Sequence, residues 1–117
     1  MVQEQRQNYE HVLTGRAQKS QGKVVVESMS LIGYDAMALG ERDLRLGATV
    51  LRQRMAEATF PILSANTAIS ETGELLAQPY VIERVADLRI GIIGLAEPMG
   101  AVPKASGDAE TLFVYDP

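Results

Sequence analysis

Residues 34–65 read YDAMALGERDLRLGATVLRQRMAEATFPILSA, and this stretch decides the fold. It contains two short apolar runs, 34–39 and 60–65, separated by a segment with apolar residues every three or four positions from Ala48 to Ala58. That spacing is typical of an amphipathic helix, with Arg52, Arg54 and Glu57 expected on its outer face. The short apolar runs predict buried strands. A strand, a helix and a strand within about thirty residues predict a βαβ unit with parallel strands and a right-handed crossover.

The flanking segments add one helix before this unit and a hairpin after it. Residues 23–32 carry an apolar stripe and are followed by Gly33, where a helix C′ residue belongs, so they predict a helix. Residues 80–85 and 88–95 are apolar runs separated by two residues, which predicts a β-hairpin. Because the run at 88–95 is apolar on both faces, we expect it to be a central strand covered on both sides.

The predicted elements fit an incomplete domain. A chain of 117 residues is long enough for one domain and too short for two. We expect a single incomplete α/β domain over residues 1–117, with a polar, frayed lead-in at 1–22, a core at 23–98 and a loose tail at 99–117. Within the tail, residues 112–115 are a candidate for a short extended piece. A strand covered on both faces needs helices on each side, and the sequence offers two convincing helices. We therefore expect a piece of a larger α/β domain, with a small free-standing module as the alternative.

Composition and charge narrow the function classes. The chain is 46% hydrophobic and 22% charged, as in ordinary folded domains. Its net charge is −4 and its Lys and Arg residues are scattered, which argues against nucleic acid as the main partner. No apolar run approaches the roughly 18 residues of a membrane span, and the polar first residues do not read as a secretory signal. The absence of Cys excludes disulfides and thiolate metal sites but leaves the compartment open.

Three blocks of the sequence resemble the 5′-nucleotidase type of calcineurin-like metallophosphoesterase. They are LIGYDAMALG at 31–40, FPILSAN at 60–66, and PYVIE at 79–83 followed by RIGIIGL at 89–95, and they occur in the family's order. The resemblance covers about residues 23–98 and implies an α/β fold that is part of the metallophosphoesterase sandwich. It also implies hydrolysis of phosphate esters of nucleotides, two divalent metal ions, and a periplasmic or extracellular location.

The same resemblance points to one candidate site, at residues 40–43. Where the family has Gly-Asn-His-Glu, this chain has Gly-Glu-Arg-Asp, so Glu41 takes the place of a metal-binding Asn and Arg42 that of a catalytic His. A carboxylate is a good ligand for a hard metal ion, and Arg can bind a phosphate bidentately but cannot give up a proton at neutral pH. The resemblance thus implies Glu41 and Asp43 as metal ligands, and Arg42 as a contact to the phosphate or the transition state.

Two other interpretations stay open for this site: a solvated loop without a catalytic role, and a whole protein that is a non-catalytic relative of the family. With one His and no Cys, the chain alone has too few ligands for a centre of two metal ions. Residues 41–43 also suit a solvated loop whose acidic side chains favour the N-terminus of the next helix. In the second interpretation, the whole protein is a non-catalytic relative of the family that is retained as a binding or structural module.

The remaining polar residues carry weaker expectations. We expect His11 on the surface, and Asp35 inside a strand with a hydrogen bond at the sheet edge. Ser64 and Ser106 lack a base partner, so neither is expected to be a nucleophile. The two glycines of the last apolar run, Gly91 and Gly94, are expected to allow close packing on the sheet.

Overall fold

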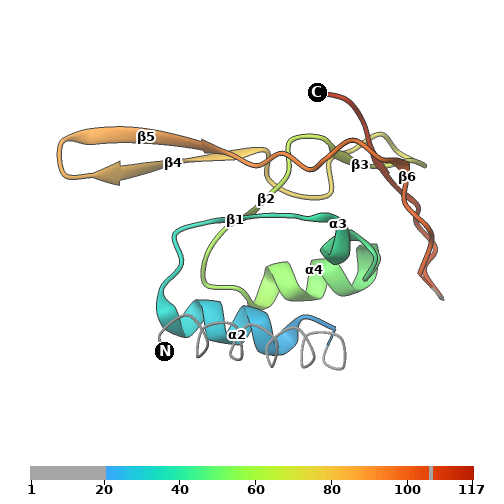
Figure 1. The fold of residues 1–117 in the computed structure, drawn as a ribbon, viewed down its shortest axis with the longest axis horizontal. Coiled ribbons are helices and arrows are strands. Elements are labelled where there is room, and N and C mark those ends of the chain that lie inside the picture. The colour runs from blue at the N-terminus through green and yellow to red at the C-terminus, as the bar shows by residue number, and fades with distance from the viewer. Residues whose placement is uncertain (1–20, 106) are drawn as a thin grey trace, which may run out of the picture.

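The computed structural model describes residues 21–105 and 107–117, so the expectations for the lead-in at 1–20, His11 and Ser106 lie outside the described residues. In the described part, two helices and one short helical turn accompany three small sheets (Figure 1). The helices are α2 (Lys23–Ile32), α3 (Glu41–Leu44) and α4 (Ala48–Glu57). The strands are β1 (Met37–Ala38), β2 (Ile62–Leu63), β3 (Thr67–Ile69), β4 (Tyr80–Val85), β5 (Leu88–Ile93), β6 (Gly100–Ala101) and β7 (Leu112–Val114).

The predicted strand, helix and strand are present as β1, α4 and β2. The strands pair in parallel, with Met37 opposite Ile62, and the Met37 amide donates to the Pro61 carbonyl at 3.0 Å. Both strands are shorter than the sequence predicts, because only Met37 and Ala38 of the first run find ladder partners. Asp35 precedes β1 and is exposed, so the expectation that it lies inside a strand is wrong.

Helices α2 and α4 lie against each other on one side of β1 and β2 (Figure 1). Helix α2 ends as predicted at Gly33, whose amide donates to the Met29 carbonyl at 3.0 Å. Its buried residue is Val26, whereas Ile32 of the predicted stripe is 66% exposed. Helix α4 buries Ala48 and Leu51 on the predicted face.

Arg54 on α4 corrects the expected outer face of that helix. Its side chain was expected outside with Arg52 and Glu57, but the residue is 8% exposed. Its Nε donates to the Gln21 carbonyl at 3.1 Å and its Nη1 lies 2.6 Å from Glu57 Oε2. Both partners accept hydrogen bonds from the guanidinium, so the buried residue has its polar groups satisfied while its stem packs between the helices.

The second sheet is one that the sequence pattern did not reveal. Strand β3 lies in the polar segment 66–78, where the sequence predicts only a turn at Thr72 and Gly73, yet its three residues are buried. It pairs antiparallel with β7, with Thr67 opposite Val114, and β6 pairs along the other edge of β7. The tail expected to be loose therefore supplies the middle strand of this sheet. The extended piece predicted near residues 112–115 is present as β7.

The predicted hairpin of β4 and β5 is present and projects away from the rest of the molecule (Figure 1). Val85 pairs with Leu88, and Ala86 in the turn has a φ of 54°. Within the described residues β5 pairs with β4 alone, and Leu88 and Ile93 are each 67% exposed. The expectation of a strand covered on both sides is thus wrong for the part of the chain that the structure describes, because there β5 has a neighbour on one edge only and no layer over its faces.

Close packing beside β2 explains one of the two glycines in the last apolar run. A Cβ added at Gly94 would lie 2.6 Å from the Leu63 carbonyl oxygen, closer than real contacts allow. At Gly91 an added Cβ would meet nothing within 4 Å, so close packing is confirmed at Gly94 and wrong at Gly91. No helix in the described residues is long and apolar enough to cross a membrane.

Candidate functional site

The candidate residues lie on the turn that follows β1 and leads into α4. Gly40 is the N-cap of the short helix α3, and the expected charged loop therefore begins as a helical turn. The Leu44 amide donates to the Gly40 carbonyl at 3.1 Å, and the Leu46 amide donates to the Asp43 carbonyl at 3.0 Å. Leu44 is fully buried and anchors the turn in the core. The candidate site thus sits on ordered backbone at the carboxyl end of a parallel strand, where sites of open α/β sheets gather.

Asp43 faces inward and is engaged by the turn itself. Its Oδ2 accepts a hydrogen bond from the Gly40 amide at 2.8 Å, as an acidic residue at the third helical position does in a capping box. Burial raises the pKa of the Asp43 carboxyl, and the Gly40 hydrogen bond lowers it by less. One carboxylate oxygen is therefore already committed to stabilising the start of α3.

Glu41 is exposed and only weakly held. Its Oε1 lies 3.0 Å from Arg45 Nη2, one turn further along the chain, and both side chains are more than half exposed. Such exposed i,i+4 pairs stabilise a helix by about 0.3–0.5 kcal/mol. Glu41 can thus leave this ion pair at little cost to meet another partner.

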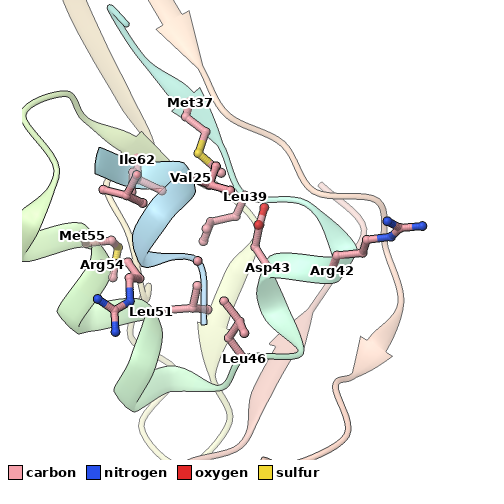
Figure 2. Close-up of a pocket in the computed structure, with 12 residues that line it drawn as sticks. Val25, Met37, Leu39, Arg42, Asp43, Leu46, Leu51, Arg54, Met55 and Ile62 are labelled. Carbon is pink, nitrogen blue, oxygen red and sulfur yellow. The ribbon is translucent and has the colours of Figure 1, made fainter. Parts of the chain in front are cut away.

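Arg42 is exposed and points away from the other two candidate side chains. Figure 2 shows its guanidinium directed outward, while Asp43 turns toward the interior. The structure therefore brings Glu41, Arg42 and Asp43 onto one turn but does not aim them at one point.

The described residues do not fit a complete metal centre. A site for two metal ions needs several oxygen and nitrogen ligands around ions about 3.5–4 Å apart. Residues 21–105 and 107–117 contain no group of three or more His, Asp or Glu side chains that could hold a metal ion. With Asp43 bonded to Gly40, the turn offers one exposed carboxylate, on Glu41, which is held only by its ion pair with Arg45.

A cavity of about 150 Å³ lies next to the turn, between the two long helices and the parallel strands (Figure 2). Most of its lining is apolar, and includes Val25, Met37, Leu39, Leu51, Met55 and Ile62. Arg42, Asp43 and Arg54 also line the cavity, but the Arg42 guanidinium is directed outward and that of Arg54 is bonded to Gln21 and Glu57. A phosphate group inside the cavity would therefore lose its hydration without matching hydrogen bonds. The cavity therefore belongs to the packing between α2 and α4 rather than to a phosphate site.

A buried polar cluster after β2 escaped the sequence reasoning. The Asn66 side chain donates to the Ala96 carbonyl at 2.7 Å and to the Tyr115 carbonyl at 3.0 Å, and accepts from the Ala96 amide at 2.8 Å. Ser64 Oγ lies 2.7 Å from Thr67 Oγ1. These bonds satisfy the polar groups of the cluster, so its role is structural. The signal was an Asn directly after a buried strand.

Comparison with known proteins gives a consistent answer, although no protein-family model matches the chain. The chain is 48% identical to protein UshA of Escherichia coli over 67 residues, which are 57% of this chain and 12% of that protein. Its fold matches a 5′-nucleotidase precursor from Thermus thermophilus with a TM-score of 0.70 and 30% identity, covering 86% of this chain and 20% of that one. The calcineurin-like phosphoesterase YfkN from Bacillus subtilis matches with a TM-score of 0.55 and 27% identity, over 74% of this chain and 31% of that one.

The chain is related to 5′-nucleotidases of the calcineurin-like phosphoesterase type. The resemblance expected from the three sequence blocks is confirmed by these relatives, and so is the α/β fold class. The chain spans about an eighth of the length of UshA and a fifth of that of the Thermus protein. What the whole protein does is therefore a matter for proposal.

Proposed function

We propose that the whole protein hydrolyses phosphate esters of nucleotides and that this chain supplies part of its α/β domain. The observation that carries the proposal is the fold match to a 5′-nucleotidase over 86% of the chain at 30% identity. The 48% identity with UshA over 67 residues supports it. The apolar residues left bare on β5 also support a domain larger than residues 1–117, because an uncovered apolar strand needs a covering layer.

For Arg42 we propose a contact to the phosphate group of the substrate. Its guanidinium is exposed on a rigid turn and points away from the packed core, so it is free to reach a ligand (Figure 2). Arg binds phosphate oxygens bidentately and stabilises negative charge that develops on them. It cannot act as a proton donor at neutral pH, so its role is electrostatic.

For the two carboxylates we propose different roles. Glu41 is the residue of this turn that is available as a metal ligand, because only an exposed ion pair to Arg45 holds it. Asp43 was expected as a second ligand, but its bond to the Gly40 amide suits it better to supporting the turn. The resemblance implies two divalent metal ions, whose remaining ligands must come from residues beyond the described ones. It also implies a periplasmic or extracellular location.

The test is phosphate release by the full-length protein. We expect release of inorganic phosphate from AMP in the presence of Mn²⁺, and loss of release with excess EDTA. Arg42→Ala should lower kcat/KM by about 100-fold, the size typical of losing one group that stabilises transition-state charge. Arg89→Ala is the matched control, because Arg89 is an exposed arginine on the hairpin, away from the turn.

Two outcomes would overturn the proposal. The first is a folded full-length protein that releases no phosphate from nucleotides with Mn²⁺, Mg²⁺, Co²⁺ or Zn²⁺, which is the result expected for a non-catalytic relative. The second is an Arg42→Ala variant as active as the Arg89→Ala control, which would remove Arg42 from the site. The non-catalytic alternative is not favoured, since the relatives carry the names of 5′-nucleotidases.

A further inference from the structure

A segment near the end of the chain, residues 107–111, lies against the beginning of α4. Asp108 accepts a hydrogen bond from Thr49 Oγ1 at 2.5 Å, and the Thr49 amide donates to the same carboxylate oxygen at 3.4 Å. The two residues are 59 positions apart in the sequence. A distant part of the chain thus reaches the first turn of this helix.

The local sequence explains why α4 needs this contact. The N-cap of α4 is Gly47, which has no side chain to accept a hydrogen bond from the free amides of the first turn. Asp108 supplies the missing carboxylate, which also interacts favourably with the helix dipole. Gly47 in turn makes room for it, because a Cβ at this position would overlap Asp108 Oδ2, and its φ is 89°.

A second carboxylate of the segment, that of Glu110, binds the exposed side chain of Arg52 on the same helix. Arg52 forms a two-point ion pair with Glu110, and its Nη2 lies 3.1 Å from Glu110 Oε2. This hydrogen bonding lowers the pKa of the Glu110 carboxyl. Asp108 and Glu110, two residues apart, therefore bind the side chains of Thr49 and Arg52 on α4.

The other end of the segment is fixed to the second sheet. The Thr111 amide donates to Glu71 Oε1 at 2.7 Å, and the next residue, Leu112, begins β7 opposite Ile69 of β3. Residues 107–111 therefore connect the β3–β7 sheet to the start of α4.

We infer that Asp108 and Glu110 are positioning residues for the turn that carries Glu41 and Arg42. The turn and the start of α4 are continuous: the Gly47 amide donates to the Leu44 carbonyl at 3.2 Å, and the Leu44 amide donates to the Gly40 carbonyl at 3.1 Å. Holding Gly47 and Thr49 in place therefore holds the far end of the candidate site. The role of these residues in catalysis rests on the proposed function, whereas their role in holding the turn does not.

Hydrogen exchange measured by mass spectrometry on the full-length protein tests the inference. Asp108→Ala should speed exchange of the amides at residues 41–50 by about tenfold, as expected when one helix cap is lost, with residues 62–69 and 112–114 unchanged. Asp108→Asn keeps an acceptor but loses the charge and should give a smaller rise, about threefold. Asp87→Ala is the control, because it removes the same charge from the exposed hairpin turn.

A double variant separates a direct contact from general loosening. Thr49→Val with Asp108→Ala should exchange no faster at residues 41–50 than Asp108→Ala alone, because both changes remove the same bond. Unchanged exchange in Asp108→Ala, or an equal rise throughout the molecule, would overturn the inference. Because this readout needs no turnover, a protein without phosphatase activity would overturn the proposed function and leave the positioning result standing.

Discussion

The β3–β7–β6 sheet and the β4–β5 hairpin both contain apolar strands, but only the sheet buries them. Leu112 and Val114 of β7 are 3% and 1% exposed, whereas Leu88 and Ile93 of β5 are each 67% exposed. β7 has a strand on each side and packs into the main core, while β5 has one neighbour and no layer over either face within the described residues. An apolar strand therefore indicates side chains that need to be buried. Whether they are buried depends on the neighbouring strands and packed layers that cover them.

The largest effect is expected at Asn66, which ties the two regions together. Asn66→Ala removes the three hydrogen bonds that the side chain makes to backbone groups, and leaves the Ala96 amide and the carbonyls of Ala96 and Tyr115 without their partner. Leaving a buried polar group unpaired costs about 1–3 kcal/mol, so we expect a loss of about 4 kcal/mol in the free energy of unfolding. Urea denaturation followed by circular dichroism measures it.

Gln53→Ala is the matched control for Asn66→Ala, since it shortens an exposed side chain on α4 and should change the free energy of unfolding by less than about 0.5 kcal/mol. A loss for Asn66→Ala no larger than that of this control would mean that the root of the hairpin is not held by the Asn66 amide.

The regions of local, periodic sequence were predictable, and the regions joined over long distances were not. Helices α2 and α4, the parallel β1–β2 pair and the hairpin follow from spacing and turn residues within short windows. Strand β3 was missed because it is only three residues long in an otherwise polar segment, and its partner β7 lies more than forty residues further on. The burial of Arg54 depends on the Gln21 carbonyl, which no pattern on α4 reveals.

The candidate site shows the same division. Its place at the end of β1 was predictable, because the charged turn at 40–43 directly follows the apolar run at 34–39 in the sequence. The opposite directions of Arg42 and Asp43 were not, because they depend on the helical turn of α3 and on the bond to the Gly40 amide. The support from Asp108 was also hidden, since it comes from 59 residues away.

A paired substitution measures the contrast between the two strands directly. Leu112→Ala should lower the free energy of unfolding by about 3 kcal/mol, because it leaves a cavity in a packed core. Leu88→Ala removes the same atoms from an exposed position of the isolated chain and should change it by less than about 0.5 kcal/mol. The two variants are compared by denaturant unfolding of this 117-residue chain.

Equal losses for Leu112→Ala and Leu88→Ala would show that the hairpin is covered in solution, and the contrast between the strands would then fail. Repeating Leu88→Ala in the full-length protein sharpens the comparison. If further residues cover β5 there, the loss should rise toward that of Leu112→Ala.

The smallest effect concerns pH and the half-buried carboxyl of Asp43. Burial raises its pKa in the folded state, so the folded protein binds this proton more tightly than the unfolded chain does. The stabilisation from this proton is complete below the pKa of Asp43 in the unfolded chain, and is lost as pH rises through its raised pKa in the folded state.

The variant Asp43→Asn tests this account, because it keeps an acceptor for the Gly40 amide and removes the titration. Relative to this variant, the unsubstituted chain should lose stability as pH rises above about 4, the ordinary pKa of Asp, by less than about 1 kcal/mol because Asp43 is partly open to solvent. Glu71 and Glu110 have lowered pKa values and contribute with the opposite sign in both proteins, so the difference between the two pH profiles isolates Asp43. Thermal melts at each pH measure the effect, with Asp87→Asn as the control. Parallel pH profiles for the unsubstituted chain and Asp43→Asn would contradict this account.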